Sequence, residues 1–347
     1  MRRTPTRFRR HLATRVIFAL LLAAMPAAAA AMCCPVPCNT CWITAQGQLN
    51  FVSFDRANGR IDLVPNIRFL GVSPDFALVV PTPSLPAFAP VSRTIWDEAA
   101  QLTAPIRSTR SNSSGCDCGE DFVSSVVDDG SPTEAGDGVT IHGRETIGGL
   151  VATTLSSDSP GALVRWLDEN GFEFTASDSA RFAPYVEREW YFTTMRPDTA
   201  NAMPFNGWNA DVAPVRITFA ATELEVPLPL ITINQNSTMT VQFYVVDDRR
   251  VDLPGFATLY ANRVSESEHA AIAERFPTIA ALVAPGRYLT KLSGVTTPLS
   301  GENGSILLAA AKDNDEFRVI AAATPRALPG ELVLFACAFI VLRRRRR

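Results

Sequence analysis

The sequence has few of the residues on which common catalytic motifs depend. It contains only three His, and His11 falls in the Arg-rich N-terminal stretch, which leaves His142 and His269 for the rest of the chain. Two His are too few for a zinc enzyme with three histidine ligands in one chain. The strings G-x-S-x-G, H-E-x-x-H, G-x-G-x-x-G and the P-loop are absent. The sequence therefore names no reaction, although residues far apart in sequence could still form a hydrolase site.

The small number of Lys and the ordinary content of Pro and Gly exclude further classes of protein. Lys291 and Lys312 are the only lysines, so the abundance of Arg reflects overall composition and is not a sign of phosphate recognition. The 25 Pro and 20 Gly together are close to the usual background, which excludes collagen-like or low-complexity chains. With 347 residues, 47% hydrophobic and 19% charged, the chain can form one large domain or two ordinary ones.

The first 31 residues have the layout of a signal peptide. Six Arg and no acid precede the apolar run Val16–Met25, which is followed by Pro26 and a block of Ala. Cleavage after Ala30 or Ala31 is expected. A short N-terminal anchor helix is the alternative, although the apolar run is shorter than the ~20 residues that a membrane-spanning helix needs.

The C-terminus, residues 326–347, also indicates membrane contact. Eleven uncharged residues, Leu332–Leu342, precede the cluster Arg343–Arg347. As a helix they would rise about 17 Å, short of the ~30 Å hydrocarbon core, and the Arg cluster would stay on the cytoplasmic side. Together with LPGE at 328–331, this layout resembles bacterial C-terminal sorting signals of the PEP-C-terminal type. A plain short tail anchor remains the alternative.

Between these ends the chain is acidic. Residues 32–330 contain 21 basic and 34 acidic residues, a net charge of about −13. That charge repels nucleic acid and anionic lipid. Nucleic acid is therefore not an expected partner. The expected partners are the membrane, through the C-terminal segment, and the export and possibly the sorting machinery.

Six cysteines in an exported chain predict up to three disulfide bonds. They are Cys33, Cys34, Cys38, Cys41, Cys116 and Cys118. A metal site formed by Cys34, Cys38, Cys41 and Cys116 is the weaker alternative. The C-x3-C-x2-C spacing matches that of radical SAM enzymes, but such a cluster needs a reducing compartment. A redox function for Cys38 and Cys41 is a further alternative, but this C-x-x-C pair lacks the βαβ context in which such redox motifs occur. No cofactor is expected.

The residue pattern predicts an α+β fold of mostly antiparallel sheets with a few short packing helices. A β-meander over 48–81 and a helix near 93–103 form the N-terminal part, 32–106, and an acidic Ser/Gly-rich loop spans 107–138. The second part, 139–325, contains helices after Ser159, near 179–186 and at 266–275, and strands that include 215–220, 228–233 and 240–246.

Six strings then resemble the bacterial family known as domain of unknown function 2330. They are FALVVPTP (76–83), WDEAAQLTAP (96–105), ALVRWLDENGF (162–172), PYVEREWYFTTMR (184–196), PVRITFAATELEVPLPL (214–230) and YLTKLSG (288–294). The resemblance implies an exported, often membrane-anchored protein with no assigned reaction. We therefore expect an envelope-associated binding or structural module and not an enzyme. An exported hydrolase or Cys-ligated metal enzyme is the alternative.

Overall fold

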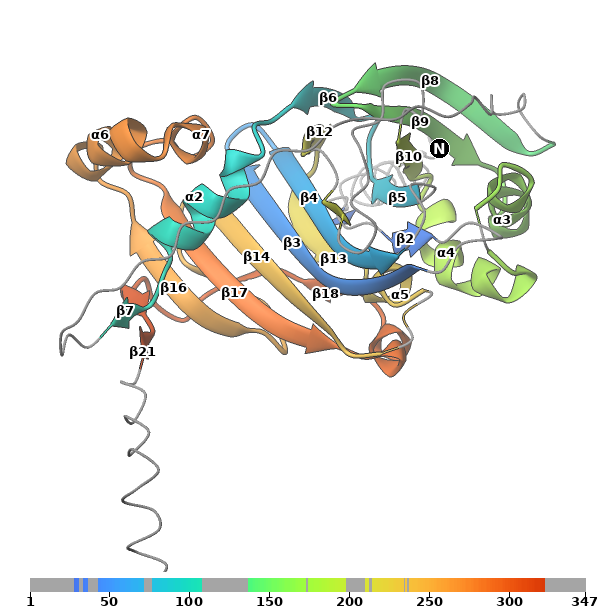
Figure 1. Cartoon of the computed structure of the whole chain (residues 1–347). Helices are drawn as coiled ribbons and strands as arrows, with labels where there is room; N and C mark the ends of the chain where they lie inside the picture. Colours follow the sequence, from blue (N-terminus) through green and yellow to red (C-terminus); the bar gives the residue numbers. More distant parts are fainter. Residues whose placement is uncertain are drawn as a thin grey trace, which may run out of the picture.

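A computed structural model describes residues 28–30, 34–36, 43–71, 77–107, 137–172, 174–197, 210–211, 214–233, 235 and 237–321. These residues form the α+β fold that the sequence predicts. Two sheets pack face to face, and helices cover the outer face of each sheet (Figure 1). Three apolar cores result: one between the sheets and one beneath each group of helices.

The larger sheet has nine strands, and all its neighbouring pairs are antiparallel except β14 and β3. In spatial order the strands are β20 (Phe317–Arg318), β16 (Ala257–Arg263), β17 (Tyr288–Thr296), β14 (Met239–Asp247), β3 (Ile43–Asp55), β4 (Arg60–Gly71), β12 (Val215–Ala220) and β6 (Ala87–Pro90), with β11 (Ala210–Asp211) beside β4.

The smaller sheet is antiparallel throughout. Its order is β2 (Cys34–Val36), β5 (Ala77–Thr82), β10 (Tyr191–Pro197), β9 (Leu150–Ser157) and β8 (Val139–Ile147). The predicted meander is therefore wrong in its third strand: β3 and β4 form a hairpin, but β5 joins the smaller sheet. Leu78, Val79 and Val80 are all buried, so β5 has apolar residues on both faces, which pack against the core between the sheets and the core beneath α3 and α4.

Short strands complete the sheets at their margins. β1 (Ala28–Ala30) runs parallel to β13 (Glu223–Val226), which also pairs with β18 (Ile306–Leu307). β15 (Val251–Asp252) pairs with β19 (Ala309–Ala310), and β7 (Ile106–Arg107) runs parallel to β21 (Ile320–Ala321).

Two groups of helices cover the sheets. The outer face of the larger sheet packs against α2 (Thr94–Leu102), α6 (Glu266–Arg275) and α7 (Pro277–Ala280). On the smaller sheet lie α3 (Pro160–Glu169), α4 (Ser179–Val186) and α5 (Leu228–Ile231), with the 3-10 turns η1 (Ala176–Asp178) and η2 (Pro298–Asn303). None of the helices within the described ranges is long and apolar enough to cross a membrane.

Local sequence signals explain where two of these helices begin. Ser159 caps α3 by accepting a hydrogen bond from the Ala162 backbone N–H at 3.2 Å, and Pro160 occupies the first turn. Ser265 and Glu268 form a capping box at the start of α6, the helix predicted at 266–275. The hydrogen bonds from Ser265 lower the pKa of Glu268. Both predicted helices are confirmed.

The predicted strand at 228–233 is wrong, because this segment contains α5. Pro229 lacks the backbone N–H that a strand would donate, but the first turn of a helix leaves that donor unused. Leu230 and Ile231 are buried, so the apolar residues that suggested a strand pack as a single helical turn.

Candidate functional site

Most of the cysteines lie outside the described residues. Cys34 is the exception, through its place in β2 opposite Val79, while Cys33, Cys38, Cys41, Cys116 and Cys118 are not described. The disulfides and the alternative metal set therefore stay predictions. Within the ranges given above, no group of three or more His, Cys, Asp or Glu residues is placed to hold a metal ion. The predicted signal peptide, apart from β1, and the C-terminal segment 326–347 also lie outside the described residues.

The structure brings His142 and Ser156 together at one end of the smaller sheet. Nε2 of His142 lies 2.8 Å from Oγ of Ser156, and the imidazole ring meets the Tyr191 ring edge-on with 4.9 Å between centroids. The β8–β9 register shifts between Ile141 and Gly143, so His142 occupies the irregular position of the exposed strand. Three neighbouring strands thus place a base, a hydroxyl and an aromatic ring in contact.

These side chains point toward the larger sheet. Ala152 of β9 and Met195 of β10 belong to the core between the sheets, and side chains two residues apart along a strand share a face. Ser156 and Tyr191 therefore lie on that face. Opposite Tyr191 in the next strand is Thr82, which is fully buried and whose Oγ1 has no hydrogen-bond partner.

A serine hydroxyl that is hydrogen-bonded to an imidazole is the contact on which a nucleophile–base pair depends. The usual third member is a carboxylate on the other ring nitrogen, and no carboxylate hydrogen-bonds His142 in the described part of the chain. Sequence motifs missed the pair because 14 residues separate the two side chains. His269 differs, because it is half-buried and its Nε2 lies 3.1 Å from the Ala280 carbonyl oxygen.

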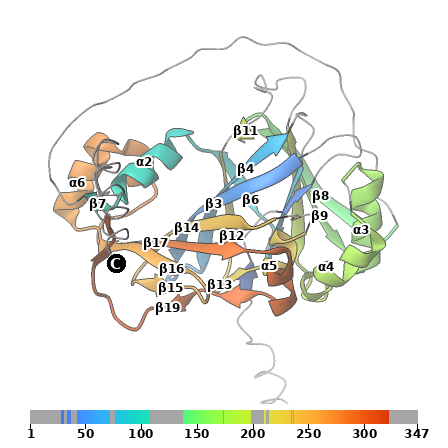
Figure 2. The same ribbon diagram turned by 60° about the horizontal axis from the view of Figure 1, so that its bottom comes forward.

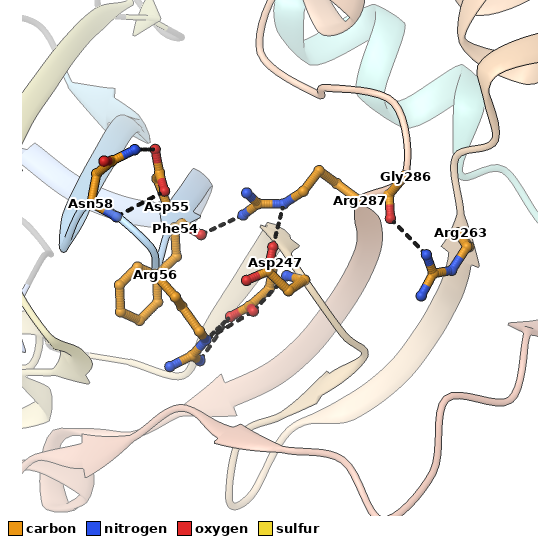
Figure 3. Close-up of polar contacts among 9 residues, drawn as sticks. Phe54, Asp55, Arg56, Asn58, Asp247, Arg263, Gly286 and Arg287 are labelled. Carbon is orange, nitrogen blue, oxygen red and sulfur yellow. Dashed lines mark hydrogen bonds and ion pairs between the residues drawn. The ribbon is translucent and has the colours of Figure 1, made fainter.

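A second polar cluster joins three loops at one end of the larger sheet (Figure 3). Arg56, in the β3–β4 turn, donates from Nε at 2.9 and 3.0 Å and from Nη2 at 2.8 Å to the carboxylate of Asp247. Asp247 ends β14 and is fully buried. The Arg56 guanidinium also lies 4.3 Å from the centroid of the Phe54 ring.

Arg287 extends this cluster to the loop before β17. Its Nε lies 3.3 Å from Oδ1 of Asp248, and its Nη2 donates to the Phe54 carbonyl oxygen. Arg263 donates from Nη1 to the Gly286 carbonyl oxygen at 3.1 Å (Figure 3). Each of these three guanidinium groups has a protein acceptor, so the cluster acts as a structural junction and is not an open anion site.

Lys291 stands apart from these ion pairs. It is half-buried on β17, opposite Tyr244 of β14 and Tyr260 of β16, and its Nζ lies 5.1 Å from the centroid of the Tyr244 ring. No carboxylate pairs with it among the described residues. Burial lowers the pKa of the Lys291 amine, raises the pKa of Tyr244 to about 12, and also raises that of Tyr260.

A bidentate ion pair connects the turn after α4 to β13. Arg188 donates from Nη1 and Nη2 to the Glu225 carboxylate at 2.8 and 3.1 Å and lies over the rings of Tyr185 and Trp190. Tyr185 is fully buried, which raises its pKa, and its hydroxyl lies 2.7 Å from Oγ of Ser305. The Tyr185–Ser305 contact links the segment after η2 to α4, and the Arg188–Glu225 ion pair links the turn after α4 to β13.

Comparison with known proteins identifies the family. A family model described as an uncharacterised protein conserved in bacteria (DUF2330) matches residues 26–297, well over half of the 347 residues. The chain therefore belongs to this family, as the six strings indicated. No curated protein and no solved structure matches it.

Proposed function

We propose that the protein is an exported, envelope-associated module that binds a partner or supports envelope structure. The observation that carries this proposal is the composition of the two chain ends. The N-terminus has an Arg-rich stretch followed by an apolar run and a block of Ala, and the C-terminus has an apolar segment followed by five Arg. The six cysteines of the region between them fit an oxidising compartment. The chain also belongs to a bacterial family with no described reaction.

Fractionation of cells that express the full chain tests the export step. The mature protein should start at Ala31 or Met32 by mass mapping and should remain with the membrane fraction. A Leu21→Arg variant interrupts the apolar run Val16–Met25 and should accumulate as precursor in the cytosol. A wild-type chain that starts at Met1 and remains in the cytosol would contradict the proposal.

A thiol count separates disulfides from a metal site. If the proposal is right, the purified exported protein has Cys33, Cys34, Cys38, Cys41, Cys116 and Cys118 blocked and contains no stoichiometric metal. Free thiols together with one bound zinc per chain would favour the set Cys34, Cys38, Cys41 and Cys116. Cys337 lies in the C-terminal apolar segment and serves as the free-thiol reference if that segment is retained.

An exported hydrolase is the second candidate, and the His142–Ser156 contact favours it. With the Ser156 hydroxyl 2.8 Å from His142, the imidazole can accept its proton as the oxygen attacks an ester carbonyl. The alcohol would leave with that proton, and water would then release the acyl group from Ser156.

A fluorophosphonate probe followed by peptide mapping tests this candidate. Labelling of Ser156 that is lost in both Ser156→Ala and His142→Gln would support it. Ser157→Ala is the matched control, because the Ser157 hydroxyl donates to the carbonyl oxygens of Gly138 and Ser159. If Ser156 takes up no probe, the His142–Ser156 contact is a structural hydrogen bond and the hydrolase candidate fails.

A further inference from the structure

Three apolar residues with exposed side chains lie on β7, β20 and β21, where the described chain ends. Ile106, Phe317 and Ile320 are 52%, 41% and 68% exposed, and we call them the exit patch. Ile106 and Ile320 are register partners in the β7–β21 pair, although more than 200 residues separate them in sequence. Large apolar side chains exposed together on a soluble surface often mark an interaction site.

The exit patch is held firmly by the fold. The Ile106 N–H donates to the Val319 carbonyl oxygen at 3.0 Å, and the Val319 N–H donates to Leu259 of β16 at 3.1 Å. Arg318 donates from Nε to the Ala104 carbonyl oxygen at 2.8 Å, just beyond the end of α2. β7 and β21 therefore lie together beside β16, on the side of the larger sheet that ends with β20 (Figures 1 and 2).

The patch is also close, along the chain, to the apolar C-terminal segment. The last described residue, Ala321, directly follows Ile320, and residues 322–331 separate it from Leu332. Ten residues span at most about 35 Å when fully extended. If Leu332–Leu342 enters a bilayer, the exit patch is held within that distance of the membrane surface.

We propose that the exit patch rests in the interfacial layer of the membrane that holds the C-terminal segment. This inference depends on the membrane attachment in the proposed function and adds an orientation: the β7–β21 corner faces the lipid. Because the body has a net charge of about −13, the contact must come from apolar side chains and not from attraction to anionic lipid. A tether of ten residues makes a weak contact effective, because the patch and the bilayer stay at high local concentration.

A second copy of the chain is a less suitable occupant. A specific protein interface buries roughly 1,000 Å² or more in total. The patch has only three side chains, and the exposed charged residues Asp313, Asp315 and Glu316 come just before Phe317 in the chain. Insertion of single apolar side chains into a bilayer interface requires no such area.

Photo-cross-linking of the full chain in zwitterionic phosphatidylcholine vesicles tests the orientation. Benzoylphenylalanine is placed singly at Phe317, at Leu299 and at Phe339, and lipid adducts are counted by mass spectrometry. Leu299 is 67% exposed in η2, which packs against α5, and is the matched surface control. Phe339 lies in the C-terminal segment and reports on anchoring itself. The expected result is lipid adducts at Phe317 and Phe339 with at least fivefold fewer at Leu299.

Each other outcome overturns the inference in a distinct way. Adducts at Phe339 alone leave the membrane anchor intact and remove the orientation. Similar yields at Leu299 and Phe317 mean that the body has no preferred face. Adducts from Phe317 to a second copy assign the patch to self-association. No lipid adduct at Phe339 removes the anchor, and the membrane attachment in the proposed function fails with it.

Discussion

Arg56 and Asp247 are 191 residues apart in sequence, and they join the β3–β4 turn to the end of β14 through three hydrogen bonds of 2.8–3.0 Å. Asp247 is fully buried and also accepts the Asp248 backbone N–H at 2.6 Å. β3 and β14 are the one parallel pair in the larger sheet, which no tight turn can connect. The ion pair therefore fixes the ends of two strands that the chain joins only over a long distance.

Removal of Arg56 should destabilise the protein strongly. In an Arg56→Ala variant the Asp247 carboxylate stays buried without its partner, and such losses typically cost about 3–5 kcal/mol. Urea unfolding of the purified chain measures the difference in free energy of unfolding. The matched control is Arg60→Ala, because Arg60 forms a 3.7 Å ion pair with Asp62 and is 54% exposed. That variant should lose less than about 1 kcal/mol. Equal losses in the free energy of unfolding for the two variants would show that the burial of Asp247 does not make its ion pair more important than an exposed one.

Glu98 forms one of the hydrogen bonds that attach α2 to α7. Its Oε2 accepts the Ile279 backbone N–H at 2.9 Å, and its side chain is buried. Glu98→Ala should cost about 1–3 kcal/mol, since it leaves a buried backbone donor without a partner. Hydrogen exchange at Ile279 should accelerate by at least tenfold. Asp97→Ala, one residue earlier and exposed, should change neither quantity. Unchanged exchange in Glu98→Ala would mean that another acceptor replaces the carboxylate.

Local signals predicted the elements whose boundaries depend on neighbouring residues. The capping residues Ser159 and Ser265 placed α3 and α6, and alternation placed β12 at Val215–Ala220. The sheet to which a strand belongs was harder to predict, because it depends on pairing with strands far away in the sequence. The segment around Val80 looks the same as a third meander strand or as the partner of β10, and only the strand 191–197, far along the chain, decides between them.

The polar contacts were not predictable for the same reason. His142 and Ser156 meet because β8 and β9 form a hairpin with an irregular register at His142, and no spacing rule encodes that irregularity. In the sequence, nothing distinguishes Arg56 and Asp247 from ordinary charged residues at turns. Only the parallel placement of β3 beside β14 brings Arg56 to the buried carboxylate of Asp247.

The amine of Lys291 should lose its proton at lower pH than a free lysine. Burial lowers its pKa from the ordinary value of 10.5. Because Lys291 and Lys312 are the only lysines, peptide mapping after acetic anhydride treatment resolves both amines in one sample. The pH profile of Lys291 acetylation should have its midpoint below 10.5, and exposed Lys312 is the internal reference for reagent activity. A Lys291 midpoint at or above 10.5 would contradict the desolvation argument.

The same group gives a stability prediction with a defined sign. Between the lowered pKa in the folded protein and 10.5 in the unfolded chain, the unfolded state binds more protons, so stability should rise with pH in that window. Lys291→Met removes this titration. The difference in free energy of unfolding between the variant and the wild type should favour the variant at pH 7 and shrink toward pH 10. A difference that is independent of pH would contradict the prediction.

Glu189 is the one non-glycine residue with positive φ among the described residues, at 57°. It follows α4, where its N–H donates to the Val186 carbonyl oxygen at 2.9 Å and the Trp190 N–H donates to the Tyr185 carbonyl oxygen at 3.1 Å. Such a helix end favours glycine, because other L-residues pay about 1–2 kcal/mol in the left-handed region. Glycine loses more backbone entropy on folding, so Glu189→Gly should stabilise the protein by a net ~0.5–1 kcal/mol in urea unfolding. Glu187→Gly, at φ −63°, should instead destabilise it by about 1 kcal/mol. If both variants lose stability, contacts of the Glu189 side chain outweigh the backbone strain.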